Sequence, residues 1–446
     1  MIRVAFATLG CRLNQVDTQQ IQSRLEARGF RSAQAAARAD VVVVNTCTVT
    51  SRAEFSDRQA IRRAARANPG ARVVVTGCWA QTSPEIVAAL PGVDLVVGNA
   101  DKGRISELIE RLVSGDALPK IQVGDIGGAR TIETAPPGPA PGRSRAFLKI
   151  QDGCQHRCAF CIVPLARGVS RSLESAAVLD RVRLLVEAGH PEVVLTGVDF
   201  GHYGADVVPR TTLAALVEAI GRIDGLRWLR LSSMLPAYFT GELLRVLADS
   251  PVSAPHFHVP LQSGSDRVLR LMRRPYTLAM YRAVVERLAS IAPRVAIGAD
   301  VIAGFPGETD ADFEETLGAI RSLPLSYLHV FPYSDRKGTE AARLAKTNRR
   351  VTHRRVGELR ALAAERSLAF RANLVGRVED VLVLESRDRA SGDLVGLTGN
   401  YVEVIFDGPD DLKRGLRRVR VTEAGAERAR GVVVRAAAPP RGEASL

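Results

Sequence analysis

Three apolar runs in the N-terminal segment each end at a cysteine, and this pattern constrains the fold more than any other feature. The runs cover 2–11, 39–47 and 71–78, and a fourth run, without cysteine, covers 93–99. Because the runs lack polar alternation, they are typical of strands buried on both faces, as in a parallel sheet. Helical stretches at 14–30 and 51–70 separate the first three. The segment 1–121 therefore predicts an open parallel α/β sheet domain.

The cysteines at the ends of these runs are Cys11, Cys47 and Cys78, named here the N-terminal trio. In an open parallel sheet the carboxyl ends of the strands meet at one edge, where such folds bind ligands. Buried structural cysteines are common in cores and are the alternative interpretation. Because all three strand ends carry a thiol, we expect a shared metal site.

The other cysteines of the six in the chain are Cys154, Cys158 and Cys161, named here the loop trio. They lie together in the stretch DGCQHRCAFC. Clustered thiols in a reducing compartment favour metal binding or catalysis over disulfides. A structural zinc site closes with four protein ligands, and this stretch has no second ligand pair nearby. Three thiolates on a [4Fe–4S] cluster leave one iron open for a small molecule, so the spacing favours iron–sulfur chemistry.

The rest of the chain divides by composition. Residues 122–145 are rich in Gly and Pro and predict a linker. Apolar strands alternate with helical stretches over 146–374, which predicts a partial (β/α)6 barrel followed by a connecting helix. Short strands with Gly and Asp turns over 375–436 predict a small OB-like β-barrel. The tail, 437–446, is expected to be disordered. The expected barrel strands are 146–151, 192–198, 227–233, 256–261, 295–305 and 327–333.

The net charge of +13 comes from an excess of arginine. One interpretation is the codon usage of a base-rich genome, and the other is a polyanionic partner, most often nucleic acid. No apolar run reaches the length of a membrane helix, and the N-terminus lacks the features of a signal peptide. We therefore expect a soluble, cytoplasmic protein with no membrane partner.

The segment IQDGCQHRCAFCIVPLARG, with Phe160 before its last cysteine, resembles the radical S-adenosylmethionine enzymes, and among them the methylthiotransferases. The resemblance covers nearly the whole chain. It implies that the loop trio holds a [4Fe–4S] cluster that binds S-adenosylmethionine. It also implies that the N-terminal trio holds an auxiliary [4Fe–4S] cluster carrying the sulfur to be inserted. The C-terminal barrel is similar to the TRAM domain of that family, an RNA-binding module.

The branch of this family that acts on threonylcarbamoyladenosine in tRNA is the most similar, through motifs such as TLGCRLNQVDT, VVTGCWAQ, VIAGFPGET and LTGNYVEV. The resemblance implies a transferase that adds a methylthio group to C2 of adenosine 37, beside the anticodon. The implied cofactors are two [4Fe–4S] clusters and S-adenosylmethionine. The implied partners are the anticodon arm of tRNA, an electron donor such as flavodoxin or ferredoxin, and a sulfur donor. Because C2 has a strong C–H bond without useful acidity, radical chemistry is required and no general base is expected.

The resemblance also implies contacts to S-adenosylmethionine and shows two departures. The residues implied to lie near that cofactor are Gly197, Ser232, Gln262, Gly304 and Glu308. Turn and barrel-mouth structure is the alternative explanation for them. Leu173 stands where relatives have a second arginine, and Leu235 stands where they often have an acidic residue. Either departure weakens the assignment of the substrate if the polar side chain orients it in relatives.

Other functions compete with this interpretation. The same chemistry could act on isopentenyladenosine in tRNA or on an aspartate of a ribosomal protein, although the N-terminal motifs argue against both. The chain could instead be a non-enzymatic iron–sulfur sensor that binds RNA through its terminal barrel. Formation of 5′-deoxyadenosine would separate the enzymes from the sensor.

Overall fold

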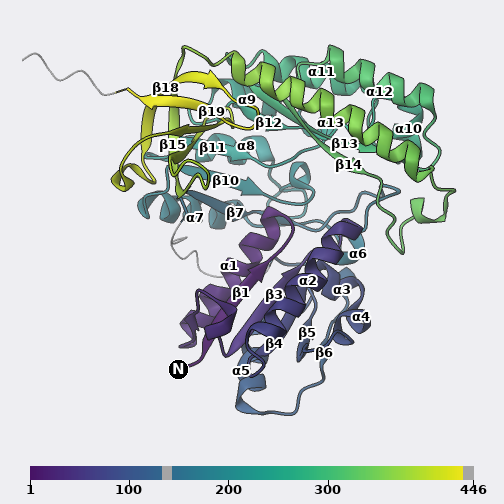
Figure 1. Ribbon diagram of the computed structural model, residues 1–446, viewed down its shortest axis with the longest axis vertical. Coiled ribbons are helices and arrows are strands. Elements are labelled where there is room, and N and C mark those ends of the chain that lie inside the picture. The colour runs from purple at the N-terminus through teal and green to yellow at the C-terminus, as the bar shows by residue number, and fades with distance from the viewer. Residues whose placement is uncertain (133–142, 435–446) are drawn as a thin grey trace, which may run out of the picture.

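A six-stranded parallel sheet forms the N-terminal part of the computed structural model, which describes residues 1–132 and 143–434 (Figure 1). The strand order is β2-β1-β3-β4-β5-β6. The strands are β1 (Arg3–Thr8), β2 (Arg31–Ser32), β3 (Val41–Thr46), β4 (Arg72–Gly77), β5 (Leu95–Val97) and β6 (Ile121–Gln122). The helices are α1 (Arg12–Ala27), α2 (Ser51–Ala67), α3 (Cys78–Thr82), α4 (Pro84–Ala88) and α5 (Ile105–Ser114).

The valines of β3 explain why its sequence lacks polar alternation. Val42 and Val44 belong to a core cluster on one face of the sheet, together with Ile61 of α2. Val41 and Val43 belong to a second cluster on the other face, with residues of α1 and α5. Both faces are therefore covered by helices, as the near-continuous apolar runs predict.

Six parallel strands form the central part, as two three-stranded sheets in the orders β11-β10-β7 and β12-β13-β14. The strands are β7 (Arg145–Lys149), β10 (Glu192–Thr196), β11 (Trp228–Leu231), β12 (His256–His258), β13 (Ala296–Ala303) and β14 (Tyr327–Pro332). A bridge between Leu229 and Ser253 links the two sheets. Because β7 and β14 are the outer strands, the barrel is partial and open between them, which confirms the expected architecture.

Helices cover the outside of this partial barrel, and four of the five begin at a threonine whose side chain caps the first turn. The capping residues are Thr212, Thr240, Thr277 and Thr309. The helices are α7 (Ser175–Glu187), α8 (Leu213–Ile220), α9 (Gly241–Asp249), α11 (Leu278–Ala289) and α12 (Asp310–Ser322). A shorter helix, α10 (Asp266–Leu271), precedes α11.

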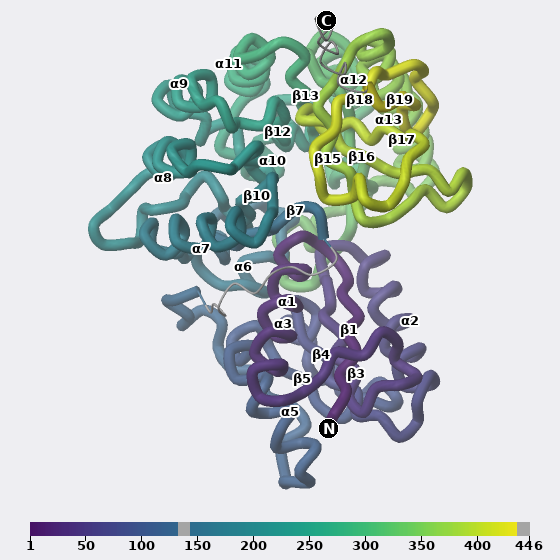
Figure 2. Tube along the Cα trace, turned by 90° about the vertical axis from the view of Figure 1, so that its left-hand side faces the viewer, coloured from purple at the N-terminus to yellow at the C-terminus, as the bar shows by residue number. Residues whose placement is uncertain are grey.

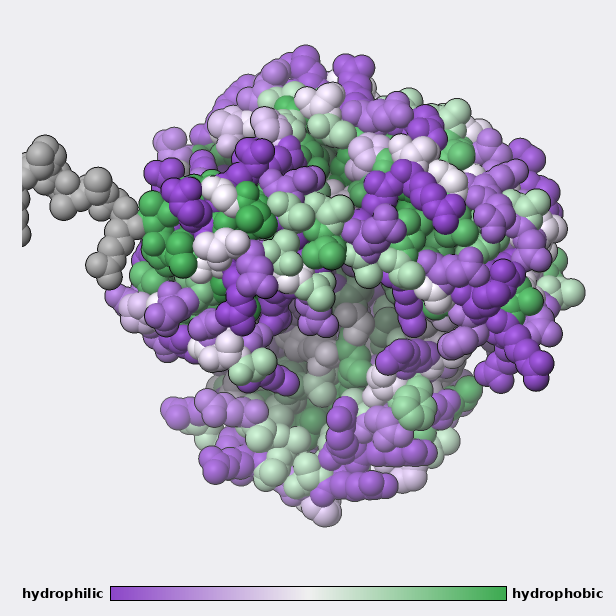
Figure 3. Space-filling model, turned by 45° about the horizontal axis from the view of Figure 1, so that its top comes forward, coloured by the Kyte–Doolittle hydropathy of each residue, from purple (hydrophilic) through white to green (hydrophobic). Residues whose placement is uncertain are grey.

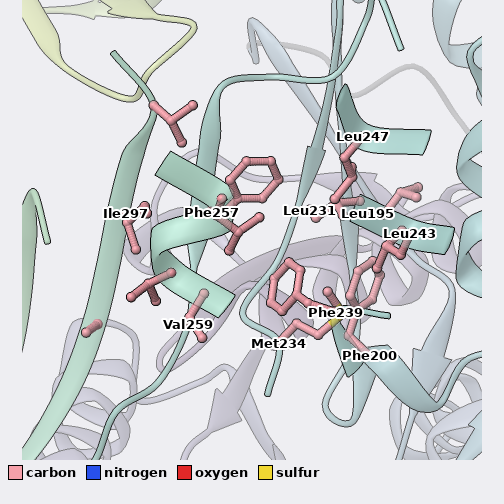
Figure 4. Packing of buried hydrophobic residues seen from close by; sticks show 14 of the residues in the cluster. Leu195, Phe200, Leu231, Met234, Phe239, Leu243, Leu247, Phe257, Val259 and Ile297 are labelled. Carbon is pink, nitrogen blue, oxygen red and sulfur yellow. The ribbon is translucent and has the colours of Figure 1, made fainter. Parts of the chain in front are cut away.

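Alternate residues of the barrel strands face opposite ways. Apolar side chains such as Leu195, Leu231 and Phe257 pack beneath the helices in one large core (Figure 4). The intervening positions face the interior of the barrel and are polar or charged. Among them are Lys149, Glu192, Arg230, His258 and Asp300.

A long helix, α13 (Arg349–Ala372), leads from the partial barrel to a closed five-stranded barrel with the order β15-β16-β17-β19-β18. The strands are β15 (Val378–Arg387), β16 (Leu394–Thr398), β17 (Glu403–Phe406), β18 (Leu416–Ala424) and β19 (Ala429–Val433). Figure 2 shows this small barrel beside the partial barrel, with the N-terminal sheet below. The small β-barrel expected at the C-terminus is confirmed.

The strands at the edges of the N-terminal sheet differ from the sequence expectation. β2 and β6 have two residues each, and so they are too short to carry a periodic pattern. The expected linker, 122–145, includes the last residue of β6 and the first of β7. Part of that linker, 133–142, and the expected tail lie outside the described residues. Within the described part, none of the helices has the length and apolarity to cross a membrane.

Candidate functional site

The N-terminal trio lies at the carboxyl ends of three neighbouring strands. Cys11 precedes α1 just after β1, Cys47 follows β3, and Cys78 begins α3 after β4. Cys11 is exposed, whereas Cys47 and Cys78 are buried. A Cβ added at Gly10 would lie 2.9 Å from the Cys47 sulfur, so a glycine is what keeps the space beside that thiol open.

The three thiols of this trio share one electrostatic environment. Burial, with smaller contributions from the neighbouring thiols Cys78 and Cys11, raises the pKa of the Cys47 thiol to about 12. A buried thiol with a raised pKa becomes a ligand only when a metal displaces its proton. The edge of the sheet therefore brings the three thiols near one another, and their role as shared metal ligands stays a prediction.

The loop trio lies between β8 (Gln151–Asp152) and α6 (Val163–Arg167). Gly153 has a φ of +74°, and a Cβ there would lie 1.9 Å from the Val169 carbonyl oxygen. The Cys154 amide donates to Gly168 over 3.0 Å, which closes the loop on itself. Arg274 donates to the Cys158 sulfur over 3.3 Å, so a guanidinium lies directly beside this thiol.

The donor sets fit iron–sulfur clusters better than single ions. Burial raises the pKa of Cys161 to about 11 and that of Cys154 further still. In a mononuclear zinc site, Zn–S bonds of about 2.3 Å place the sulfurs about 3.8 Å apart. Among the described residues, only His258, Asp300 and His329 bring three ligand atoms within 4.8 Å of one another. Each trio is more widely spaced, as a polynuclear cluster held by thiolates requires.

A buried network of ion pairs joins the N-terminal sheet to the partial barrel between the two trios. Asp17 of α1 contacts Lys149 over 2.6 Å and Lys102 over 2.8 Å. Arg167 contacts Asp17 over 3.1 Å and Asp152 over 3.0 Å. All these side chains are at least nine-tenths buried. The two parts of the chain are thus joined by charged side chains that are almost entirely buried.

The pKa shifts in this network follow from its charges. Burial opposes ionisation of Asp17, but Lys102, Lys149 and Arg167 hold its pKa well below the usual value. The same balance, led by Arg167, lowers the pKa of Asp152 to about 2. Burial would lower the pKa of Arg167, but Asp152, Asp17 and the thiols Cys78 and Cys11 raise it. Arg167 therefore carries its charge next to the N-terminal trio.

Asn99 makes a second connection between the trios. Its side-chain amide lies 3.7 Å from the Cys78 sulfur and donates over 2.7 Å to the Ala166 carbonyl oxygen. Ala166 belongs to α6, the helix that follows the loop trio directly. The two cysteine trios consequently lie on either side of one interface.

The residues expected near S-adenosylmethionine all follow the carboxyl ends of barrel strands. Gly197 packs on Gln151, and a Cβ there would lie 2.8 Å from the Gln151 amide oxygen. Ser232 has a buried hydroxyl with no hydrogen-bond partner among the described residues, and Gln262 has a φ of +65°. The Gly304 amide donates to Glu308.

Glu308, Leu173 and Leu235 make their contacts with other residues of the protein itself. The Glu308 carboxylate pairs with Arg355 of α13 over 2.7 Å, in a buried contact. That pair joins α13 to the mouth of the barrel. Leu173 and Leu235 pack against the apolar core of the barrel. Their side chains therefore contribute to the core rather than to a polar site.

Sequence reasoning missed the residues that organise the interface. Gln151 accepts from the amides of Val198 and Asp199 over 2.8 Å and donates to Gly153, so it ties the loop trio to β10. Lys149 and Gln151 are polar positions in the otherwise apolar sequence run 146–151, and this break was the available signal. Asp17 and Arg167 carry no such signal, because their roles depend on partners far away in the sequence.

Comparisons with known proteins agree with this geometry. Residues 3–98 match the family model described as uncharacterized protein family UPF0004, and residues 148–320 match the radical SAM superfamily. The chain is 38% identical to threonylcarbamoyladenosine tRNA methylthiotransferase MtaB of Bacillus subtilis, over 98% of this chain and 97% of that one. It is 39% identical to MtaB of Aquifex aeolicus, over 93% of this chain and 99% of that one. The chain belongs to the radical S-adenosylmethionine methylthiotransferase family.

Other relatives and solved structures extend the comparison. The tRNA-2-methylthio-N(6)-dimethylallyladenosine synthase of Cereibacter sphaeroides is 35% identical over 94% of this chain and 95% of that one. The radical S-adenosylmethionine methyltransferase TsrM of Kitasatospora setae superposes with a TM-score of 0.57 at 18% identity, covering 74% of this chain and 73% of that one. This second likeness concerns the fold alone. As a member of this family the chain is a transferase, and its cofactors are S-adenosylmethionine and [4Fe–4S] clusters.

Proposed function

We propose that this chain adds a methylthio group to C2 of N6-threonylcarbamoyladenosine 37 in tRNA, giving 2-methylthio-N6-threonylcarbamoyladenosine. The observation that carries the proposal is identity of 36–39%, over 91–98% of this chain, to three threonylcarbamoyladenosine tRNA methylthiotransferases. The two cysteine trios on one interface supply a chemical reason for it. One site must open a C–H bond and another must deliver sulfur to the same carbon.

Each trio has its own part in this proposal. Cys154, Cys158 and Cys161 would hold the [4Fe–4S] cluster that binds S-adenosylmethionine, and Cys11, Cys47 and Cys78 would hold the auxiliary cluster. When bound, this pair of cofactors supplies a carbon radical that can take hydrogen from an unactivated C–H bond. Gly197, Ser232, Gln262 and Gly304 would lie along S-adenosylmethionine at the mouth of the barrel, with Glu308 holding the Gly304 amide.

The residues between the trios would keep their separation constant and exclude water. Asp17, Lys149 and Arg167 hold the N-terminal sheet against the barrel through contacts of 2.6–3.1 Å. A rigid interface matters because the carbon and the sulfur must approach within bonding distance, and a displacement of about 1 Å can cost a hundredfold in rate. Reactive carbon radicals also require a dry site.

RNA would bind across the basic surface of the protein. A groove of about 650 Å³ lies between the start of α2 and the start of α13, and its basic lining residues are Arg52, Lys346, Arg349, His353 and Arg360. Figure 3 shows hydrophilic side chains on both sides of the hollow that separates the N-terminal sheet from the rest of the molecule. We assign the small barrel as an RNA-binding TRAM domain and the location as cytoplasmic. The domain limits 1–121, 146–374 and 375–436 are part of this proposal.

Mass spectrometry of tRNA nucleosides from a deletion strain tests the substrate. The strain should lose 2-methylthio-N6-threonylcarbamoyladenosine and retain N6-threonylcarbamoyladenosine, and complementation with the wild-type gene should restore the product. If the methylthio form persists, the proposed substrate is wrong. The enzyme, purified without oxygen, should produce 5′-deoxyadenosine, and Cys154→Ala should lose this activity. That pair of results would exclude a non-enzymatic iron–sulfur sensor.

The second candidate substrate is dimethylallyladenosine 37. The observation in its favour is the 35% identity to the Cereibacter sphaeroides synthase. A gene deletion that removed 2-methylthio-N6-dimethylallyladenosine and left the threonylcarbamoyl form methylthiolated would support this candidate. If the chain instead modifies an aspartate of a ribosomal protein, that protein from the deletion strain should lack the mass of the methylthio group.

A further inference from the structure

A cluster of arginines lies at the open side of the partial barrel. It consists of Arg12, Arg143 and Arg145, whose guanidinium carbons all lie 5.7–5.8 Å from the centre of the Phe147 ring. Arg145 and Phe147 belong to the outer strand β7, and Arg12 begins α1 of the N-terminal sheet. The arginine cluster therefore forms where two parts of the chain meet.

The small β-barrel contributes a tyrosine to the same place. Tyr401, in the turn between β16 and β17, accepts a hydrogen bond of 2.5 Å from Arg12. The guanidinium carbons of Arg12 and Arg145 lie 5.7 Å from the centre of the Tyr401 ring. The backbone of Tyr401 has a φ of +69°, a strained conformation for a residue other than glycine. All three parts of the chain thus converge on one cationic site.

Positive charge at this site exceeds negative charge. Glu192, a buried acid nearby, forms its short contact of 2.7 Å with Arg230. Arg145 reaches Glu192 only at 3.8 Å, and its buried Nη1 atom has no hydrogen-bond partner among the described residues. Asp300 is shared by His258 and His329. Glu192 and Asp300 are therefore committed to other cations, and the arginine cluster retains capacity for an anion.

A cavity opens beside this cluster. It has a volume of about 250 Å³, and its lining includes Arg145, Tyr401 and the acids Glu403 and Glu427. Glu403 pairs with Arg428 over 2.5 Å, and Glu427 lies near Arg371, so these two acids also have cations of their own. A water molecule occupies about 30 Å³ of liquid, so the cavity has room for a group the size of an amino acid. It lies between the start of β7, the starts of β13 and β14, the end of α13 and the small barrel.

The substrate of the proposed function carries a matching anion. In threonylcarbamoyladenosine the threonine is attached to N6 through its amino group, which leaves a carboxylate at the end of the substituent. A dimethylallyl group on N6 is neutral and apolar instead. Guanidinium groups bind carboxylates with two parallel, charge-assisted hydrogen bonds, and arginine is the residue best suited to this contact.

The position of Arg12 relates this anion site to the reacting carbon. Arg12 follows Cys11 of the N-terminal trio directly, so its guanidinium lies within one side chain's reach of that trio. In adenine, C2 and the N6 substituent lie on the same edge of the six-membered ring, on either side of N1. A base with C2 toward the N-terminal trio would therefore direct its N6 substituent along α1 toward the arginine cluster.

We propose that the arginine cluster, together with Tyr401, binds the carboxylate of the threonylcarbamoyl group and so selects this nucleoside over those with neutral N6 substituents. The inference rests on the proposed function. It assigns substrate selection to residues from all three parts of the chain. Arg145 is central because its Nη1 atom has no hydrogen-bond partner among the described residues and reaches Glu192 only at 3.8 Å.

Binding measurements with three anticodon stem-loop RNAs test the proposal. The RNAs are identical except that position 37 is threonylcarbamoyladenosine, unmodified adenosine or dimethylallyladenosine. The wild-type protein, with its clusters, should bind the first more tightly than the other two. Arg145→Gln should weaken binding of the first RNA about tenfold and leave the other two unchanged, since it removes a hydrogen-bonded charge pair. Arg145→Lys should restore part of the preference.

The control is Arg245→Gln on the outer helix α9, which removes one charge from an exposed ion pair with Asp249. It should leave all three affinities unchanged.

Thermal midpoint and iron content show whether Arg145→Gln folds. If it misfolds, Arg143→Gln, a change outside the barrel strands, repeats the test. An unchanged preference in the variants overturns the proposal. Equal weakening for all three RNAs also overturns it, because the arginines would then bind phosphate. Failure of the wild-type enzyme to methylthiolate the first RNA would instead overturn the proposed function.

Discussion

Asp17 and Lys149 form a buried ion pair of 2.6 Å across the interface between the N-terminal sheet and the partial barrel. The two residues are 132 positions apart in the sequence, and both side chains are at least 95% buried. Asp17 also pairs with Lys102 and Arg167, so one carboxylate balances three cations. This contact joins the two parts of the chain that carry the cysteine trios.

Replacing Asp17 by Asn should destabilise the protein strongly. The change leaves Lys102, Lys149 and Arg167 buried with only Asp152 to balance them, and breaking a buried pair in this way costs about 3–5 kcal/mol. Urea denaturation gives the change in the free energy of unfolding. Asp40→Asn is the matched control, because Asp40 pairs with Arg3 at the exposed surface of the same sheet. An exposed pair is worth at most about 1 kcal/mol, and equal effects of the two changes would contradict the account.

Acid should remove the contribution of the same network. Burial raises both pKa values, but nearby cations outweigh it: Lys102 foremost holds the pKa of Asp17 well below its usual value, and Arg167 foremost lowers that of Asp152 to about 2. A carboxyl with a lowered pKa stabilises the fold above its unfolded pKa of about 3.9 and loses this effect as the pH falls through its folded pKa. Urea denaturation at a series of pH values should show a constant difference between wild type and Asp17→Asn above about pH 5, shrinking toward pH 2. A difference that stays constant down to pH 2 would mean that Asp17 is not the titrating group.

Gly153→Ala should prevent the loop trio from binding iron. The new methyl group would lie 1.9 Å from the Val169 carbonyl oxygen, and the loop could not close. Gly189→Ala is the control, since Gly189 also has a positive φ, +84°, but no atom within 4 Å of the added Cβ. The control should cost about 1 kcal/mol in stability and retain full iron content. Iron analysis of the anaerobically purified proteins decides, and normal iron content in Gly153→Ala would show that the loop tolerates the clash.

Binding of tRNA should weaken steeply with salt. Each phosphate contact made by a lysine or arginine adds about −0.7 to −0.9 to the slope of log K against log salt concentration. Replacing Arg349 in the basic groove by Gln should reduce the magnitude of the slope by about one such step. Fluorescence anisotropy over a salt series measures the slope. A flat response would mean that the net charge of +13 does not serve RNA binding.

The sequence predicted the features that depend on local pattern. The Val-rich run before Cys47 identified a strand buried on both faces, and its end identified the sheet edge where the N-terminal trio meets. The partial barrel was predicted in the same way. Its strands and helices alternate along the sequence, and each strand could be recognised from its own residues.

Features that depend on distant pairing could not be predicted in this way. Nothing near Asp17 in the sequence indicates that Lys149 and Arg167 will face it, because their approach requires the domains to dock. The same holds for Tyr401, which is one polar aromatic residue in a turn until the small barrel brings it to Arg12. Two-residue strands such as β2 are specified by their neighbours and have no pattern of their own.

Iron content and 5′-deoxyadenosine formation, measured together on cysteine variants, test the central claim most directly. The wild-type protein, purified without oxygen, should contain about eight irons per chain, which corresponds to two [4Fe–4S] clusters. Replacing Cys11, Cys47 and Cys78 by Ala should leave about four irons and preserve 5′-deoxyadenosine formation, but abolish the methylthio product. Replacing Cys154, Cys158 and Cys161 should also leave about four irons and abolish 5′-deoxyadenosine. Full iron content in either variant, or loss of 5′-deoxyadenosine in the first while four irons remain, would contradict the account.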